Sequence, residues 1–220
     1  MDTITLIQSA LPAILLSFIM SLGGNHWISK LYIKAQQRDI LSFPDQTDRR
    51  AKFRIPLLFV MQFICIWKAW MHINQPFILG YTILAIAFLS FITVTDFEQY
   101  VIFDAMLLPF SIIGLCYTLQ LQFPFREHIA AALGGGLLFF LLTVLTKGAI
   151  GGGDIKLVAA MGLWFGYQSL LTIIMYGLLA GGTAALLMLI AKQKQRNSYF
   201  AYGPYFALSG IGILLGLIPF

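Results

Sequence analysis

Long apolar runs separated by short polar stretches make up most of the chain. Eight runs can be distinguished, and most come close to the roughly 20 residues that a helix needs to cross a bilayer. They are Ile4–Leu22, Ile55–His72, Phe77–Val94, Ala105–Gln120, Ile129–Thr146, Ile155–Phe165, Ser169–Ala191 and Gly203–Pro219. The sixth run is short, and we expect it either to re-enter the membrane or to continue into the seventh. The pattern predicts an all-α, polytopic membrane bundle of about eight transmembrane segments.

The composition supports a lipid environment for this bundle. Of the 220 residues, 59% are hydrophobic and 10% are charged, and the mean hydropathy is +0.84. Soluble domains carry roughly 25% charged residues. A soluble protein of this size could not bury so many apolar side chains, so we expect several helices to face lipid.

Positive charge is distributed unevenly between the two predicted sides of the membrane. Of the 14 Lys and Arg residues, all but Lys68 and Arg126 lie in or beside the stretches that follow the first, fifth and seventh runs. Cytoplasmic loops are enriched in these residues, so we place the three stretches in the cytoplasm and both termini outside. Asp2 stands where a cleavable signal peptide has basic residues, which predicts an uncleaved anchor helix.

The same asymmetry accounts for the net charge of +5, so the charge does not indicate a nucleic-acid partner. We expect the basic stretches to contact anionic lipid headgroups instead. Cys65 and Cys116 lie in apolar runs far apart, and the three His residues are scattered. Neither residue type forms a spacing typical of a metal site or a disulfide framework, so we predict no metal.

Four of the nine acids lie close to predicted membrane segments, where an ionisable group needs a specific reason. Asp96 follows the third run, at the unfavourable negative end of a helix dipole, so capping does not explain it. An ordinary loop residue is the alternative. Glu98 and Asp104 lie in the same loop, and we expect them to be structural or to orient a substrate. The eight-segment topology places this loop on the same side as Asp154.

Asp154 follows Gly151, Gly152 and Gly153 and precedes the sixth run. A helix N-cap is the ordinary explanation for the Asp, but it does not explain three glycines. Glycine permits positive φ and close backbone approach, which suggests a loop that lets another group come near. The spacing does not match a phosphate-binding loop, although Lys156 follows closely.

Asp96 and Asp154 are therefore candidates for a catalytic pair of carboxyl groups. Two carboxyl groups at one site share a proton because their like charges repel. The ionised group can activate water as a general base while the protonated group donates a hydrogen bond to a carbonyl. From the helix dipoles, we expect Asp154 to carry the charge and Asp96 to hold the proton.

Three stretches resemble the type IV prepilin leader peptidases, which are Gly-x-Gly-Asp membrane aspartyl proteases. The first is Gly151–Leu157 with Ala159–Trp164, and the second contains Asp96, Glu98, Asp104 and the Leu107-Leu108-Pro109 helix. The third, Phe200–Tyr205, is similar to the family's Phe-Gly-Pro-Phe stretch. The resemblance covers about Leu89 to the C-terminus.

The resemblance implies an aspartic endopeptidase of the bacterial inner membrane. Family members cut the short basic leader of type IV prepilins and of type II secretion pseudopilins after a glycine, at the cytoplasmic face. The family's catalytic aspartates correspond to Asp96 and Asp154, with Gly151–Gly153 and Lys156 supporting the site. Many members also methylate the new amino terminus, so S-adenosylmethionine is implied only where methylation is retained, and cleavage itself needs no cofactor.

The stretch between the first two runs departs from the long members of this family. They carry two Cys-x-x-Cys pairs there, whereas Gly24–Arg54 contains no cysteine, so we expect a short variant without zinc. We divide the chain into an anchor helix with a basic cytoplasmic loop, residues 1–54, and a membrane peptidase domain, residues 55–220. The sequence does not indicate whether the protein serves pilus assembly, competence or secretion. It does not indicate the oligomeric state either.

Two other functions are compatible with the same acids. A transporter could relay ions or protons through Asp96 and Asp154, although the acids lie at one membrane face and no inverted repeat is visible. An inactive relative could act as a scaffold for pilus assembly.

Overall fold

A computed structural model describes residues 3–148, 150–191 and 200–219, and all regular secondary structure in these ranges is helical. Seven α-helices and one short 3-10 helix are seen in this part of the chain. They are α1 (Thr3–Gln36), η1 (Pro44–Gln46), α2 (Thr47–His72), α3 (Pro76–Gln99), α4 (Asp104–Gln120), α5 (Phe125–Leu145), α6 (Gly152–Ile190) and α7 (Gly203–Leu214). Five of them, α1, α2, α3, α5 and α6, contain stretches long and apolar enough to cross a membrane. The predicted all-α membrane fold is confirmed.

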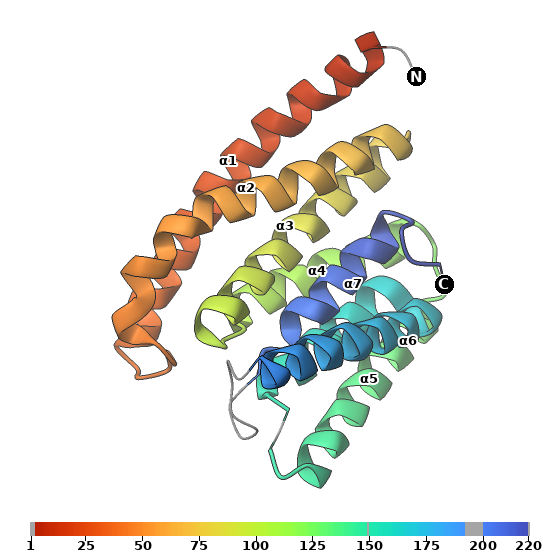
Figure 1. The fold of residues 1–220 in the computed structure, drawn as a ribbon. Coiled ribbons are helices and arrows are strands. Elements are labelled where there is room, and N and C mark those ends of the chain that lie inside the picture. The colour runs from red at the N-terminus through yellow and green to blue at the C-terminus, as the bar shows by residue number, and fades with distance from the viewer. Residues whose placement is uncertain (1–2, 149, 192–199, 220) are drawn as a thin grey trace.

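The helices form a bundle with α3 at its centre. In Figure 1, α1 and α2 lie together along one side and α5 lies on the other, with α3, α4, α6 and α7 between them. More than half of the most apolar window of α3 is buried, whereas less than a third of the corresponding window is buried in α1, α2, α5 and α6. The apolar exterior is consistent with lipid contact, because lipid replaces water around these side chains.

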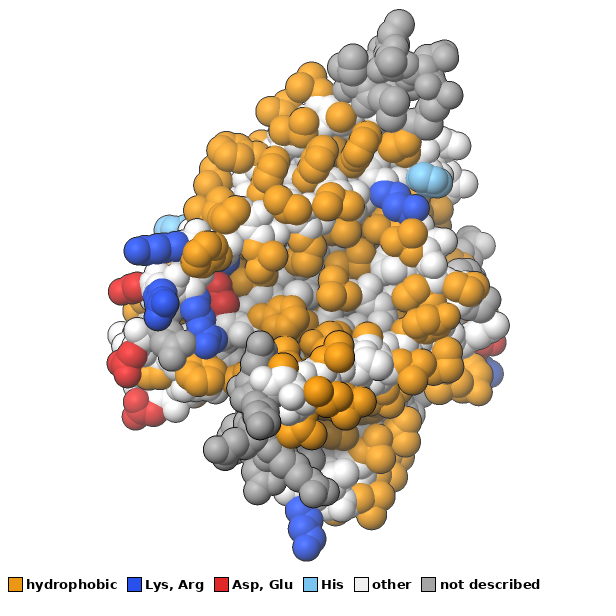
Figure 2. All heavy atoms as spheres, viewed as in Figure 1, with side chains coloured by type: hydrophobic (Ala, Val, Ile, Leu, Met, Phe, Trp, Pro, Cys, Tyr) orange, Lys and Arg blue, Asp and Glu red, His pale blue; other side chains and the backbone are white. Residues whose placement is uncertain are grey.

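Figure 2 shows that hydrophobic side chains cover most of the visible face, while the largest group of charged side chains gathers at the edge near the connection from α1 to α2.

The connection between α1 and α2 is much shorter than the predicted loop Gly24–Arg54. The first helix continues to Gln36 and the second begins at Thr47, so the domain boundary predicted after Arg54 falls inside α2. Lys and Arg are good helix formers, and a helix can continue into the aqueous phase after its apolar run ends. Gly24 lies inside α1, and a methyl group at this position would collide with the Phe91 ring.

The sixth and seventh predicted runs form the single element α6, which reverses direction at Gly166. This residue has φ 68° and ψ −174°, a conformation that is essentially restricted to glycine. An added methyl group at Gly135 would meet both Val158 and Leu170, so residues on either side of Gly166 lie against the same point of α5. Both ends of α6 therefore lie at the same end of the bundle (Figure 1).

The sixth and seventh runs thus form two helices that meet at the non-helical Gly166, so they do not continue as one straight helix. Whether the sixth run re-enters the membrane stays a prediction. The number of membrane crossings and the position of the termini remain predictions. The basic residues Lys192, Lys194 and Arg196 lie outside the described residues.

Candidate active site

Asp96 lies in the last turn of α3, not in the loop that the sequence suggested, because the helix continues to Gln99. The helix ends at Tyr100, which adopts the left-handed conformation, and the Tyr100 N–H donates to the Asp96 carbonyl oxygen at 2.9 Å. The Asp96 residue is only 5% exposed. A buried carboxyl group at the negative end of a helix dipole is costly, so helix stability does not account for it.

Asp154 lies in the first turn of α6 and is 8% exposed. The residue that caps this helix is Gly151, whose carbonyl oxygen accepts a hydrogen bond from the Asp154 N–H at 3.1 Å. Asp154 therefore does not serve as the N-cap, which was the ordinary explanation for its presence. Its side chain accepts a backbone hydrogen bond from Gly151 and also reaches Gly203, at the start of α7.

The three glycines before Asp154 provide close approach without positive φ. None of them is among the positive-φ glycines of the chain. A Cβ atom on Gly153 would lie 3.0 Å from the Cβ of Ile102, in the connection between α3 and α4, whereas a Cβ on Gly152 would meet nothing within 4 Å. The glycines thus let the start of α6 pack closely against the residues that follow Asp96.

Gly203, at the start of α7, brings the two acids to one point. A Cβ atom there would lie 2.6 Å from Oδ2 of Asp96 and 3.3 Å from Oδ1 of Asp154. Only a residue without a side chain leaves room for both carboxyl groups. Gly203 lies in the stretch Phe200–Tyr205 that resembles the family's motif, but its sequence position alone did not assign it to the site. Its position before Pro204 at the start of a helix was the available signal.

The two carboxyl groups line a common cavity of about 200 Å³. The other residues around it are Tyr100, Val101, Ile102 and the glycines 151–153. A larger cavity of about 490 Å³ shares Val101, Ile102 and Gly153 with the first, and Lys34 and Arg38 of the first helix and loop also line it. The two cavities therefore adjoin at these three residues.

One oxygen of each carboxyl group, Oδ2 of Asp96 and Oδ1 of Asp154, is buried and has no hydrogen bond of regular geometry among the described residues, although the Gly203 backbone is close enough to interact weakly with both groups. Both are the oxygens that face Gly203. Buried polar atoms are normally paired, so two unpaired oxygens at one point need a functional explanation. The acids are also close enough for their charges to repel, which favours one shared proton.

The remaining predicted site residues lie around this pair without joining it. Glu98 is buried, and its carboxylate forms an ion pair with Arg54 of α2 at 2.8 Å, so this conformation does not present it to a substrate. Asp104 and Lys156 are exposed and form an ion pair at 2.7 Å, which links the starts of α4 and α6. Both line the larger cavity, where Asp104 remains a candidate for substrate orientation.

No group of three or more His, Cys, Asp or Glu side chains suited to a metal ion is found in the described ranges. The pair of carboxyl groups is the feature of the site that can perform acid–base chemistry. Two acids in a common cavity, one able to accept a proton and one able to donate it, suit the hydrolysis of an amide bond.

Comparison with known proteins identifies the same part of the chain. Residues 83–186 match the model of the type IV leader peptidase family. The prepilin leader peptidase/N-methyltransferase of Neisseria gonorrhoeae is 34% identical over 148 residues, which is 64% of this chain and 50% of the relative. The enzyme of the same name from Dickeya chrysanthemi is 33% identical over 122 residues, 52% of this chain and 43% of the relative.

A more extensive match, to the prepilin leader peptidase/N-methyltransferase of Legionella pneumophila, is 26% identical and covers 76% of this chain and 60% of the relative. The chain thus spans about half the length of the curated relatives it matches. No solved structure matches it. The family match contains both Asp96 and Asp154, together with all of α4 and α5. The resemblance to the type IV leader peptidase family is therefore confirmed over residues 83–186.

Proposed function

We propose that the chain is a membrane aspartyl endopeptidase that cuts the short basic leader of type IV prepilins or pseudopilins after a glycine. The observation that carries this proposal is the meeting of Asp96 and Asp154 at Gly203, with one unpaired buried oxygen on each acid. The names of the related enzymes supply the substrate class. Bacterial prepilins or pseudopilins are thus the proposed partners.

The two helix ends suggest a role for each acid. Asp154 lies at the positive end of the α6 dipole, which favours a carboxylate, whereas Asp96 lies at the negative end of α3. The Asp154 carboxylate would take a proton from water as its oxygen attacks the scissile carbonyl carbon. Asp96 would donate its proton to the carbonyl oxygen. Collapse of the tetrahedral intermediate would break the C–N bond, with the proton on Asp154 passing to the leaving amine and one hydroxyl proton of the intermediate returning to Asp96.

The distribution of basic residues supports a site on the cytoplasmic side of the inner membrane. Lys34 and Arg38 line the same cavity as Gly153, so the basic connection from α1 to α2 and the acids lie at one end of the bundle. Lys and Arg are enriched in cytoplasmic loops. A substrate that keeps its basic leader in the cytoplasm would then present its cleavage point at the depth of the acids.

Cleavage of a full-length prepilin by membranes that carry the chain tests this function. We expect the wild type to release a leader that ends in glycine, and Asp96→Asn and Asp154→Asn to release none, because Asn can neither accept nor donate the required proton. The exposed Asp48, in the first turn of α2 as Asp154 is in the first turn of α6, provides the matched control Asp48→Asn. All four proteins are compared at equal abundance by immunoblotting.

Normal cleavage by either site variant would show that the acids are not the catalytic pair, and absence of cleavage by the wild type would contradict the peptidase function itself. The names of the relatives also include an N-methyltransferase activity. The intact mass of the mature product, with and without S-adenosylmethionine, reports methylation as a separate result.

A further inference from the structure

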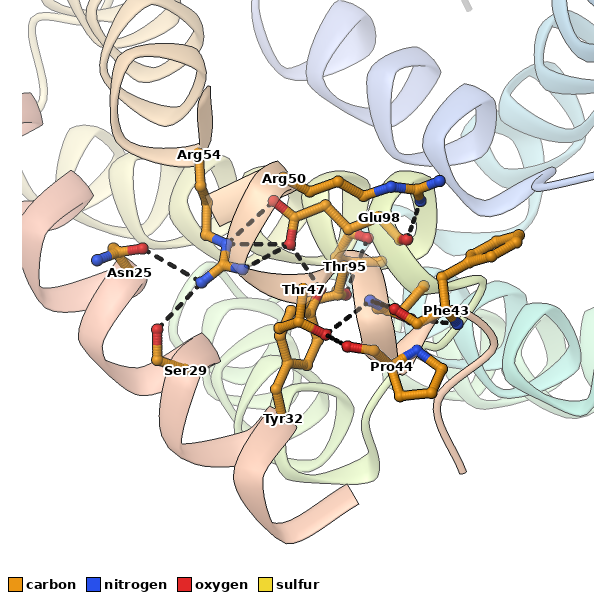
Figure 3. A network of polar contacts seen from close by, with 12 residues as sticks. Asn25, Ser29, Tyr32, Phe43, Pro44, Thr47, Arg50, Arg54, Thr95 and Glu98 are labelled. Carbon is orange, nitrogen blue, oxygen red and sulfur yellow. Dashed lines mark hydrogen bonds and ion pairs between the residues drawn. The ribbon is translucent and has the colours of Figure 1, made fainter. Parts of the chain in front are cut away.

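The buried ion pair between Glu98 and Arg54 lies two residues beyond Asp96, at the end of the same helix. Nε of Arg54 donates to both carboxylate oxygens of Glu98 at 3.0 Å, and Nη2 lies 2.8 Å from Oε2. The Arg54 and Glu98 side chains are 1% and 10% exposed. A two-pronged contact of this kind fixes orientation as well as distance. Figure 3 shows the pair at the centre of a polar network.

The network joins three helices at this point. The Tyr32 hydroxyl of α1 donates to Oε2 of Glu98 at 2.8 Å, and the Arg54 guanidinium lies over the Tyr32 ring. Nη1 of Arg54 donates to Oδ1 of Asn25 at 3.2 Å and to the Ser29 hydroxyl at 3.1 Å, both on α1 (Figure 3). Glu98 of α3 is therefore held by α1 and α2 together.

Two further contacts hold the backbone at the end of α3. Nη1 of Arg50 donates to the Glu98 carbonyl oxygen, which has no partner within a helix that ends here. The Gln99 side chain accepts from the Phe43 N–H at 2.8 Å and donates to the Phe43 carbonyl oxygen at 2.9 Å. The end of a helix otherwise frays easily. Here the last turn is clamped to the connection between α1 and α2.

Asp96 lies on the opposite side of this clamped turn. Residues two positions apart on a helix do not face each other, so anchoring Glu98 toward α1 and α2 directs Asp96 toward α6 and α7. We propose that Arg54 and Glu98 are positioning residues that hold Asp96 in the orientation required for cleavage. The proposal rests on the peptidase function above and adds that the α1–α2 pair sets the geometry of the catalytic helix.

Removing both charges together provides the cleanest test. The Arg54→Gln/Glu98→Gln double variant leaves no unpaired buried charge, so it is expected to fold where either single variant could fail. We expect its kcat for prepilin cleavage to fall about a hundredfold with KM little changed, because a small displacement of a catalytic group has an effect of that size. Arg54→Lys keeps the charge but loses the planar fork, so its kcat should lie between those of the double variant and the wild type.

Limited trypsin digestion gives a second readout that does not depend on activity. Release of the end of α3 should speed tryptic cleavage in the α1–α2 connection, where Arg38 is exposed, relative to cleavage at the exposed Arg126 at the start of α5. The exposed Arg49 lies on the same helix as Arg54, and Arg49→Gln is the matched control for both readouts. It should match the wild type in kcat and in the ratio of the two cleavages.

A double variant with the kcat of the wild type would overturn the proposal, and so would a loss confined to KM or an unchanged tryptic ratio. If the wild type cuts no prepilin, the peptidase function has failed, whereas the tryptic ratio still shows whether Arg54 and Glu98 clamp the end of α3. The failure of one proposal is thus separable from the failure of the other.

Discussion

The last turn of α3 carries two buried acids in opposite circumstances. Glu98 faces α1 and α2, where Arg54 and Tyr32 engage its carboxylate. Asp96 faces α6 and α7, where it meets a second acid and keeps an unpaired oxygen. Burial alone is the same for both. The difference lies in their partners: Glu98 is stabilised by an ion pair, whereas Asp96 lies beside another acid. A buried acid near a membrane that gains no such stabilisation is the better indicator of a catalytic role.

Neutralising Glu98 on one side of this turn, and Asp154 in the carboxyl pair on the other side, gives the largest expected contrast in stability. Glu98→Gln leaves Arg54 buried without its partner, which should lower the free energy of unfolding by about 3–5 kcal/mol. Asp154→Asn removes a buried charge from the carboxyl pair that Asp96 forms, so its stability should equal or exceed that of the wild type. Thermal unfolding of the purified proteins in one detergent compares the two. Equal losses in both variants would show that Asp96 and Asp154 stabilise the fold, contrary to the comparison.

Filling the space beside Gly203, where Asp96 meets Asp154, should have a smaller effect. A methyl group in Gly203→Ala would displace Oδ2 of Asp96, so we expect cleavage to fall roughly ten- to hundredfold. Gly182→Ala is the control, since a methyl group on Gly182 of α6 meets nothing within 4 Å. The relative kcat/KM of the two variants is the measurement, and full activity of Gly203→Ala would mean that the acids need not approach this closely.

The exposed pair of Asp104 and Lys156 should show the smallest effect. If Asp104 attracts the basic leader, Asp104→Asn should raise KM about threefold without changing kcat, since exposed charge pairs are worth less than about 1 kcal/mol. Lys156→Gln leaves the Asp104 carboxylate available and should not raise KM. An equal rise in both variants would indicate that the ion pair only holds the starts of α4 and α6 together.

The sequence was most informative where the periodicity of apolar runs and the chemistry of single residues agreed. The runs predicted the helices, and Asp96 and Asp154 were singled out because neither position had a sufficient structural reason to be acidic. The structure brings these two acids together, as the topology allowed. Their catalytic role, and the orientation in the membrane, remain predictions.

Other features depended on contacts that a single sequence does not contain. Arg54 was counted among the basic loop residues, but it lies inside α2 and is buried against Glu98. The reason is that α2 begins at Thr47, before its apolar run begins. Glu98 was expected to be structural or to orient a substrate, and only the position of α1 shows its partners. Gly203 could not be assigned to the site, since its neighbours come from helices that precede it by about 50 and 100 positions.

The turn at Gly166 has a consequence for how the chain enters the membrane. From Gly152 to Phe165, α6 is only about 20 Å long, whereas the hydrocarbon core is about 30 Å thick. The first half of α6 is therefore too short to span the membrane by itself. We expect the translocon to insert it together with the second half, as a helical hairpin. Any side chain at Gly166 would oppose that reversal, and it would also press on His128, 3.1 Å from the added carbon. Substitution of Gly166 should consequently lower the amount of protein that accumulates in the membrane, because misinserted chains are degraded, whatever its effect on peptide hydrolysis.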